Sequence, residues 1–209
     1  MADKPVKLDL GQFYGAEGHD QLMGRYNNSA TVYDQAMEEY QWKGPSMVLP
    51  VLQRYVAPDA RILDGGAGTG LMGETLTEAG FTNLYAMDPS SRLLAEAARK
   101  NIYRQTRQMK LGEKLDYGHD FFDAVVVIGV FTPGHASWDS FDELIRITRS
   151  GGYIIYTLRS DRTPPGFLER QRVLEQDNAW VLAQRGEEFQ SLPRGEPEVH
   201  HRVWAFRVL

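Results

Sequence analysis

Short apolar runs alternate with amphipathic stretches from residue 61 onward, and this alternation predicts the fold. The run at 122–129 is almost continuously apolar and β-branched, as expected of a central strand that is covered on both faces. Strands are predicted at 61–64, 84–88, 122–129, 153–158, 180–185 and 199–208. Helices are predicted at 71–79, 89–100, 138–148 and 167–176, with a break at 150–152 and no clear period in 101–120.

Repeated strand–helix units predict a parallel sheet with right-handed crossovers, and the last two strands are expected to pair antiparallel. We therefore predict an α/β fold with a doubly wound, mostly parallel, seven-stranded Rossmann-like sheet and an antiparallel terminal strand. In such a sheet the ligand lies beyond the carboxyl ends of the central strands.

Residues 1–58 precede this alternation and are predicted to form a helical N-terminal extension. Tyr33, Met37 and Tyr40 share one helical face, and a second amphipathic stretch follows them. The extension is expected either to close over the ligand site as a lid or to pack as a helix on the edge of the sheet. Residues 59–209 are predicted to form the domain that contains the sheet and the ligand site.

The net charge, the cysteine content and the apolar runs of the chain indicate which binding partners to expect. The chain of 209 residues has a formal net charge of -5, which argues against a surface for phosphate backbones or anionic membranes. It contains no cysteine, which excludes disulfides and thiolate chemistry. The first residues lack a signal-peptide pattern, and no run approaches the roughly 20 apolar residues of a membrane span. We expect a cytoplasmic protein with no nucleic-acid or membrane partner.

A glycine-rich turn follows the first predicted strand and precedes a helix, where backbone N–H groups come close to a ligand. Gly68, Gly70 and Gly73 match the dinucleotide pattern G-x-G-x-x-G, so a nicotinamide-dependent oxidoreductase remains an alternative. Asp64 at the mouth of the turn would repel a pyrophosphate and attract an ammonium and a sulfonium, as in S-adenosylmethionine. Asp88, at the end of the next strand, is suited to accept hydrogen bonds from both ribose hydroxyls. The alternative for either acid is a helix cap or a turn residue.

This turn resembles the first motif of the class I S-adenosylmethionine-dependent methyltransferases, D-x-G-x-G-T-G, residue by residue from Asp64 to Gly70. The resemblance implies that the glycines approach the methionine part of the cofactor and that the acid after the second strand holds the ribose. Many members place another acidic residue after the third strand to contact adenine, whereas residues 108–111 of this chain contain no acidic residue. Apolar packing by Met87, Met109 and Leu111 is the expected substitute. The predicted cofactor residues are Asp64, Gly65, Gly66, Gly68, Thr69, Gly70, Met87, Asp88, Met109, Leu111 and Gly129.

The stretch from Phe122 to His135, with Glu143-Leu-Ile-Arg146, Gly151-Gly152 and an upstream Tyr33-Asp34, resembles a narrower subgroup. Its members are the methyltransferase-like proteins similar to the one encoded in the Williams–Beuren chromosomal region. This likeness covers most of residues 30–160.

The loop at 129–137 leaves the sheet beside the cofactor end and is the predicted acceptor wall. His135 is suited to deprotonate an acceptor near neutral pH, and its alternative is a hydrogen bond to a loop carbonyl. Tyr33 is the second catalytic candidate. The loop lacks the Asn/Asp-Pro-Pro-aromatic sequence of amino-methylating enzymes that act on DNA. No metal site is expected, because His200 and His201 are adjacent and point to opposite faces of a strand.

The sequence therefore predicts methyl transfer from S-adenosylmethionine to a small-molecule O, N or S acceptor by in-line displacement. A sulfonium is already an activated donor, so a dedicated base is optional. The alternatives are a catalytically silent S-adenosylmethionine-binding module that acts through a partner, and the oxidoreductase. No particular oligomeric state is predicted.

Overall fold

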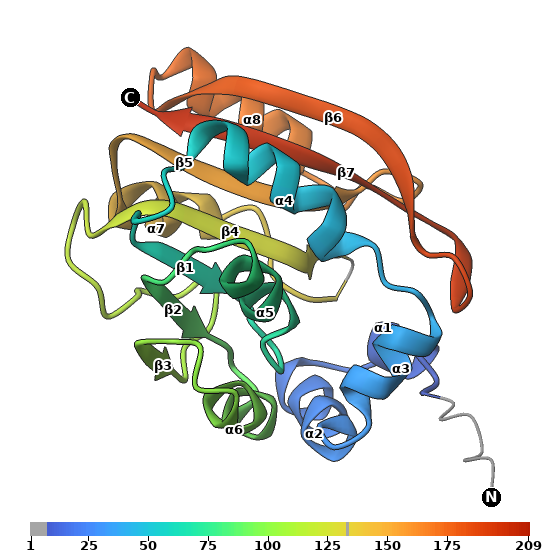
Figure 1. Ribbon diagram of the computed structural model, residues 1–209. Helices are drawn as coiled ribbons and strands as arrows, with labels where there is room; N and C mark the ends of the chain where they lie inside the picture. Colours follow the sequence, from blue (N-terminus) through green and yellow to red (C-terminus); the bar gives the residue numbers. More distant parts are fainter. Residues whose placement is uncertain (1–7, 133) are drawn as a thin grey trace, which may run out of the picture.

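Residues 8–132 and 134–209, which this computed structural model describes, contain one seven-stranded sheet in the order β3-β2-β1-β4-β5-β7-β6 (Figure 1). The strands are β1 (Ile62–Gly65), β2 (Leu84–Met87), β3 (Gln105–Arg107), β4 (Phe122–Phe131), β5 (Thr148–Arg159), β6 (Trp180–Leu192) and β7 (Glu196–Val208). The helices are α1 (Gly11–Tyr14), α2 (His19–Ser29), α3 (Tyr33–Glu39), α4 (Gly44–Tyr55), α5 (Leu71–Glu78), α6 (Ser91–Arg99), α7 (Ser140–Ile147) and α8 (Phe167–Gln176).

The strand directions confirm the predicted fold class. Strands β1 to β5 are parallel to one another, and β7 lies antiparallel to both β5 and β6. The strand order runs outward in one direction from β1 to β3 and in the other from β4 onward. Crossovers on the two sides of β1 and β4 therefore diverge, which opens a crevice at the carboxyl ends of these two strands.

Strand β4 has one apolar layer on each face. Val125 and Val127 belong to the cluster that contains Phe141 of α7, whereas Ala124 and Val126 belong to the cluster that contains α4 and α5. All four β4 side chains are fully buried. This two-sided burial explains why β4 has a continuous apolar run in place of strict alternation.

Several boundaries differ from those predicted. The helix predicted to 148 ends at Ile147, because Thr148 already pairs with Phe122 as the first residue of β5. The break expected at 150–152 is a register irregularity inside this strand. Strands β6 and β7 are longer than predicted, with 13 residues each. The unassigned stretch at 101–120 contains β3, whose three residues are too few to show a period.

The N-terminal helices divide into two groups. Helix α4 packs on the sheet in the same apolar cluster as Ile62 of β1. Helices α1 to α3 lie beyond the carboxyl ends of β1 and β4, where they have an apolar cluster of their own that includes Phe13, Leu22 and Met37 (Figure 1). The predicted division at residues 58 and 59 stays a prediction, and residues 1–7 lie outside the described part.

Polar contacts fix α2 and α3 to the sheet domain. Asn27 accepts hydrogen bonds from the Ser90 hydroxyl at 2.9 Å and from the Arg92 N–H at 3.1 Å. Asp34 accepts from the hydroxyl of Thr69 in the glycine turn and from Lys100 Nζ at 2.7 Å. The extension is therefore held in position over the glycine turn. No helix in the described ranges has the length and apolar character that a membrane span requires.

Two glycine substitutions test the packing of the sheet. Gly152→Ala would place a Cβ 2.6 Å from the Asp123 carbonyl oxygen and 2.9 Å from that of Arg149. Backbone atoms cannot rotate away, so we expect the free energy of unfolding to fall by about 1–3 kcal/mol. Gly24→Ala, in the exposed face of α2 with open space around it, is the control and should raise it by about 0.5–1 kcal/mol. Urea unfolding measures both, and an equal effect of the two substitutions would contradict the packing described.

Candidate active site

A cavity of about 360 Å³ lies at the crevice between β1 and β4. Its walls come from the glycine turn, the end of β2, the loops after β3 and β4, helices α1 to α3, and the β6–β7 hairpin. This volume is within the range of about 300–1,000 Å³ that is typical of small-molecule sites. The sheet therefore places a site of suitable size where the strand order predicts one.

Most of the predicted residues line this cavity. The cofactor candidates in its wall are Gly66, Gly68, Thr69, Met87, Asp88, Leu111 and Gly129, together with the catalytic candidates Tyr33 and His135. Asp64, Gly65, Gly70 and Met109 are not among the lining residues. Gly65 lies within β1, paired with Met87. Met109 is turned toward the Asp116 N–H, which donates to its sulfur at 3.4 Å.

The glycine turn needs its glycines for two reasons. Gly66, Gly68 and Gly70 have φ values of 81°, 55° and 93°, in the left-handed region that disfavours a side chain. At Gly66 a Cβ would overlap Val130, whereas around Gly68 nothing lies within 4 Å of the Cβ position. The backbone at Gly68 is therefore open to a ligand in the cavity.

Asp64 lies behind the turn and not at its mouth, which corrects the position expected from sequence. Its Oδ2 accepts a hydrogen bond from the Tyr103 hydroxyl at 2.6 Å, and its side chain is 3% exposed. Burial raises its pKa to about 7, and the bond from Tyr103 opposes this shift. Tyr103 also packs against Gly70 and fills the space that a side chain at Gly73 would need. No local sequence pattern predicts this contact, because Asp64 and Tyr103 are 39 positions apart in the chain.

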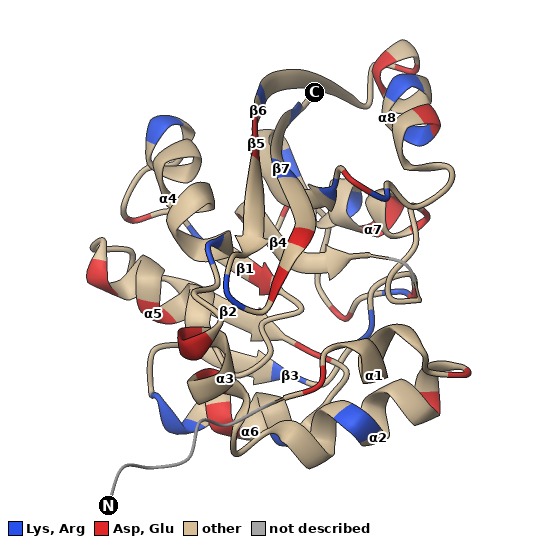
Figure 2. Ribbon diagram, turned by 90° about the vertical axis from the view of Figure 1, so that its right-hand side faces the viewer, with Lys and Arg blue, Asp and Glu red and all other residues tan. Residues whose placement is uncertain are grey.

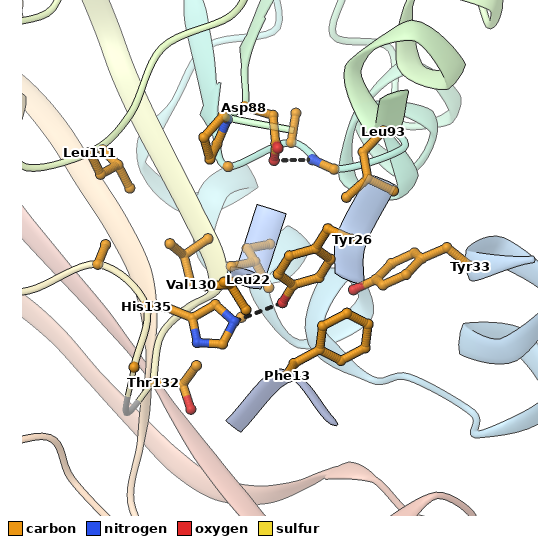
Figure 3. A pocket seen from close by; sticks show the side chains of 18 of the residues that line it. Phe13, Leu22, Tyr26, Tyr33, Asp88, Leu93, Leu111, Val130, Thr132 and His135 are labelled. Carbon is orange, nitrogen blue, oxygen red and sulfur yellow. Dashed lines mark hydrogen bonds between the residues drawn. The ribbon is translucent and has the colours of Figure 1, made fainter. Parts of the chain in front are cut away.

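Asp88 joins the end of β2 to the glycine turn. Its Oδ2 accepts from the Gly68 N–H at 2.8 Å (Figure 3). Its Oδ1 accepts from the Ser90 N–H, also at 2.8 Å. Burial raises the pKa of this carboxyl to about 6, and the two N–H donors oppose the shift. Each oxygen keeps a further acceptor position for a ligand hydroxyl.

His135 contacts helix α2 inside the cavity. The Tyr26 hydroxyl and His135 Nε2 are 2.8 Å apart, and Tyr26 stacks on Phe13 with ring centroids 4.3 Å apart (Figure 3). The partners are 109 positions apart in the chain, so no local pattern predicts the pair. Burial raises the pKa of the Tyr33 hydroxyl, with the charge of Asp88 the next cause, so Tyr33 stays protonated at neutral pH and can donate a hydrogen bond.

The loop after β3 brings Lys110 and Leu111 to the cavity wall. Residues 108–111 contain no acid, and Gln108 donates to the Pro89 carbonyl at 3.0 Å. Lys110 is a lining residue that the sequence analysis missed. Lysines and arginines elsewhere are spread over several helices and strands (Figure 2).

The two adjacent histidines of β7 point to opposite faces, as the strand period predicts. His200 Nδ1 lies 2.9 Å from the Glu198 carbonyl oxygen, whereas His201 is 6% exposed and lines the cavity. The described residues contain no group of three or more ligands that would hold a metal ion. From the sequence, His201 is considered only as a metal ligand, and no local pattern predicts its place in the cavity wall.

Comparisons with known proteins agree with this geometry. The profile of a family described as Methyltransferase domain matches residues 63–156. Human methyltransferase-like protein 27 is 29% identical over an alignment of 183 residues, and the match covers 84% of this chain and 74% of that protein. The 4+2 cyclase SpnF has a TM-score of 0.72 at 13% identity, over 92% of this chain and 97% of its own. Magnesium protoporphyrin IX methyltransferase of Synechocystis, crystallised with S-adenosylmethionine, has a TM-score of 0.60 at 18% identity, over 94% and 88%.

The family match runs from β1 into β5 and contains both the glycine turn and Asp88. Residues 63–156 carry a methyltransferase domain, and the chain has the fold of the class I S-adenosylmethionine-dependent methyltransferases. Its cofactor is S-adenosylmethionine. The methyltransferase cavity fits this molecule, because Gly68 leaves open space and Asp88 offers unused acceptor positions to a ribose.

Asp88→Ala is expected to weaken S-adenosylmethionine binding by about 1–3 kcal/mol, because charge-assisted hydrogen bonds to the ribose are lost. Isothermal titration measures the change. Asp59→Ala, an exposed acid outside the cavity, is the control and should bind the cofactor as the unmodified protein does. An unchanged affinity of Asp88→Ala, in a protein that remains folded, would remove Asp88 from the cofactor site.

Asp64 should make stability depend on pH. Its pKa is raised from 3.8 to about 7 on folding, so its contribution is complete below pH 3.8 and is lost as pH rises through 7. Asp64→Asn keeps an oxygen for Tyr103 and cannot ionise. Its free energy of unfolding relative to the unmodified protein should rise by on the order of 2 kcal/mol between pH 5 and pH 8. Urea unfolding over this range measures the difference; a difference as flat as that of Asp59→Asn would refute the buried charge.

Proposed function

We propose that this methyltransferase transfers the methyl group to an O, N or S atom of a small molecule held in the cavity beneath α1 to α3. The observation that carries the proposal is the cavity itself, whose volume is about 360 Å³. We call the part beside the glycine turn (66–69) its turn side and the part beneath α1 to α3 its lid side. A wall formed by three helices excludes a large acceptor and leaves room for a small one.

The cofactor is proposed to lie on the turn side. Gly66, Gly68 and Thr69 are the candidates for the methionine part, and Asp88 is the candidate for the ribose. Met87 and Leu111 are the apolar candidates for adenine. When bound, S-adenosylmethionine supplies a methyl group that its sulfonium has already activated. The chain's part is to orient the two molecules and to keep water out.

Helices α1 to α3 act as the lid in this proposal. Their hydrogen bonds to Ser90, Thr69 and Lys100 support a closed position over the turn. Phe13, Leu22 and Tyr26 give the lid an apolar and aromatic inner surface. An apolar cover of this kind lowers the local dielectric constant and strengthens the polar contacts beneath it.

The Tyr26–His135 pair is the proposed route for the acceptor proton. The bond to the Tyr26 hydroxyl fixes the orientation of the His135 imidazole. In this proposal His135 takes the proton that the acceptor loses as the methyl group arrives, and it becomes an imidazolium. Tyr33 has a different proposed role as a neutral donor that positions the acceptor, since its pKa is raised by burial.

We further infer that the chain groups with the Williams–Beuren region methyltransferase-like proteins. The similarity to human methyltransferase-like protein 27 over 84% of the chain supports this grouping. The likeness to SpnF, whose name describes a cyclase, shows that the shared fold also supports other reactions. Formation of S-adenosylhomocysteine is therefore the required readout.

The function is tested in two stages. The first is titration with S-adenosylmethionine and S-adenosylhomocysteine, with NADH as the control ligand. The second measures S-adenosylhomocysteine release with a small-molecule extract, an RNA fraction and a protein fraction as acceptors. We expect binding of the first two ligands, none of NADH, and turnover only with the small-molecule extract. Turnover with RNA or protein alone would overturn the acceptor class, and binding without any turnover would favour the silent module.

With an acceptor from that extract, His135→Gln should lower kcat about 100-fold and leave the Kd of S-adenosylmethionine unchanged. Tyr26→Phe should also lower kcat but by less, because it removes only the hydroxyl that contacts His135 Nε2. Tyr55→Phe, whose hydroxyl bonds to Ala183 outside the cavity, is the matched control. Unchanged kcat in both cavity variants would exclude this pair from proton transfer.

A further inference from the structure

One end of the cavity takes no part in the proposed cofactor contacts. This acceptor end is formed by Phe13, Tyr14, Ser191, Leu192, Val199 and His201. Strand β7, which carries His201, is three strands away from β1 in the sheet. At the usual strand spacing this separation is about 14 Å. The acceptor end and the glycine turn are therefore separate parts of one cavity.

His201 is held in the wall by the period of its strand. Val199, His201 and Val203 are buried and alternate with the less buried His200 and Arg202. The strand pairing also fixes its position, since His201 lies opposite Arg159 of β5. The orientation of the His201 side chain thus follows from the backbone and does not depend on a side-chain contact.

The His201 ring is buried with an unused polar atom. Its Nδ1 has no hydrogen-bond partner among the residues that the structure describes and is sealed from the cavity. Its Nε2 also has no partner among them but is not sealed, and the residue is 6% exposed. A polar atom that lines a cavity without a partner in the protein loses a hydrogen bond when an apolar ligand displaces water from it, so Nε2 favours a ligand that carries a polar group. Nearby Phe189 contributes only a ring contact, with centroids 6.2 Å apart.

The charges around the acceptor end are already paired. Arg159 forms an ion pair with Asp161 at 2.9 Å, and Glu196 accepts from the Tyr14 hydroxyl at 2.9 Å. Burial, followed by the nearby charge of Arg159, lowers the pKa of His201 to about 4, with Asp161 opposing, so the imidazole is neutral at neutral pH. An ionised ligand would lose its hydration here without gaining a countercharge.

We propose that the acceptor end binds an electrically neutral, largely apolar molecule by one polar group, and that His201 determines this specificity through a hydrogen bond. The inference rests on the proposed function, which assigns the other part of the cavity to the cofactor. His201 is a recognition residue in this proposal, and proton transfer stays with His135.

Four probes that share a methyl-substituted benzene ring test the specificity. Protein saturated with S-adenosylhomocysteine is titrated with p-cresol, p-xylene, p-toluate and p-methylbenzylammonium. We expect p-cresol to bind about threefold to tenfold more tightly than p-xylene, as one net hydrogen bond requires, and the two ions to bind more weakly than either. Tighter binding of either ion than of p-cresol would overturn the proposal.

Variants then assign the preference to His201. In His201→Leu the affinity for p-cresol should fall to that for p-xylene, while p-xylene binding is unchanged. In His200→Leu, the matched control on the opposite face of β7, the p-cresol preference should persist. A p-cresol preference that survives in His201→Leu would refute the assignment.

A measurement on the unmodified protein covers the case in which His201→Leu does not fold. NMR signals of the His201 imidazole nitrogens should shift on addition of p-cresol, and those of His200 should not. Titration with S-adenosylhomocysteine tests the proposed function separately from the role of His201. No binding of this ligand refutes the proposed function, whereas binding without a p-cresol preference refutes only the role of His201.

Discussion

The burial of β4 on both faces is the constraint on which the rest of the structure depends. A strand without a solvent-facing side must have helices above and below it, and the chain supplies α4 and α5 on one face and α7 and α8 on the other. Because β4 lies directly beside β1, the crossovers to its two sides diverge at its carboxyl end. The cavity is a consequence of this packing.

The two buried carboxylates near the cavity are stabilised in the same way, by hydrogen-bond donors. Buried carboxylates are costly, and the chain offsets the cost at Asp88 with two backbone N–H donors and at Asp64 with the Tyr103 hydroxyl. The donor to Asp88 is Gly68 of the glycine turn, so the acid at the end of β2 holds the turn in shape. The same carboxylate is therefore available to shape the backbone of the turn and to receive a ligand.

The N-terminal helices make the other half of the site. Asn27 and Asp34 join α2 and α3 to the N-terminus of α6 and to the glycine turn. These contacts place Tyr26 against His135 and bring aromatic rings over the end of the sheet. Their partners lie in the glycine turn and at the start of α6, so the position of α2 and α3 and the shape of the turn are physically connected.

The sequence by itself determined the fold class, the glycine turn and the place of Asp88, because periodicity and turn chemistry are local properties of a chain. It did not determine that Asp64 lies behind the turn with Tyr103, that Tyr26 meets His135, or that His201 lies in the cavity wall. Each of these depends on segments far apart in the chain, whose meeting is decided by sheet order and helix packing. Local pattern places a residue on an element, and only the tertiary structure decides what that element faces.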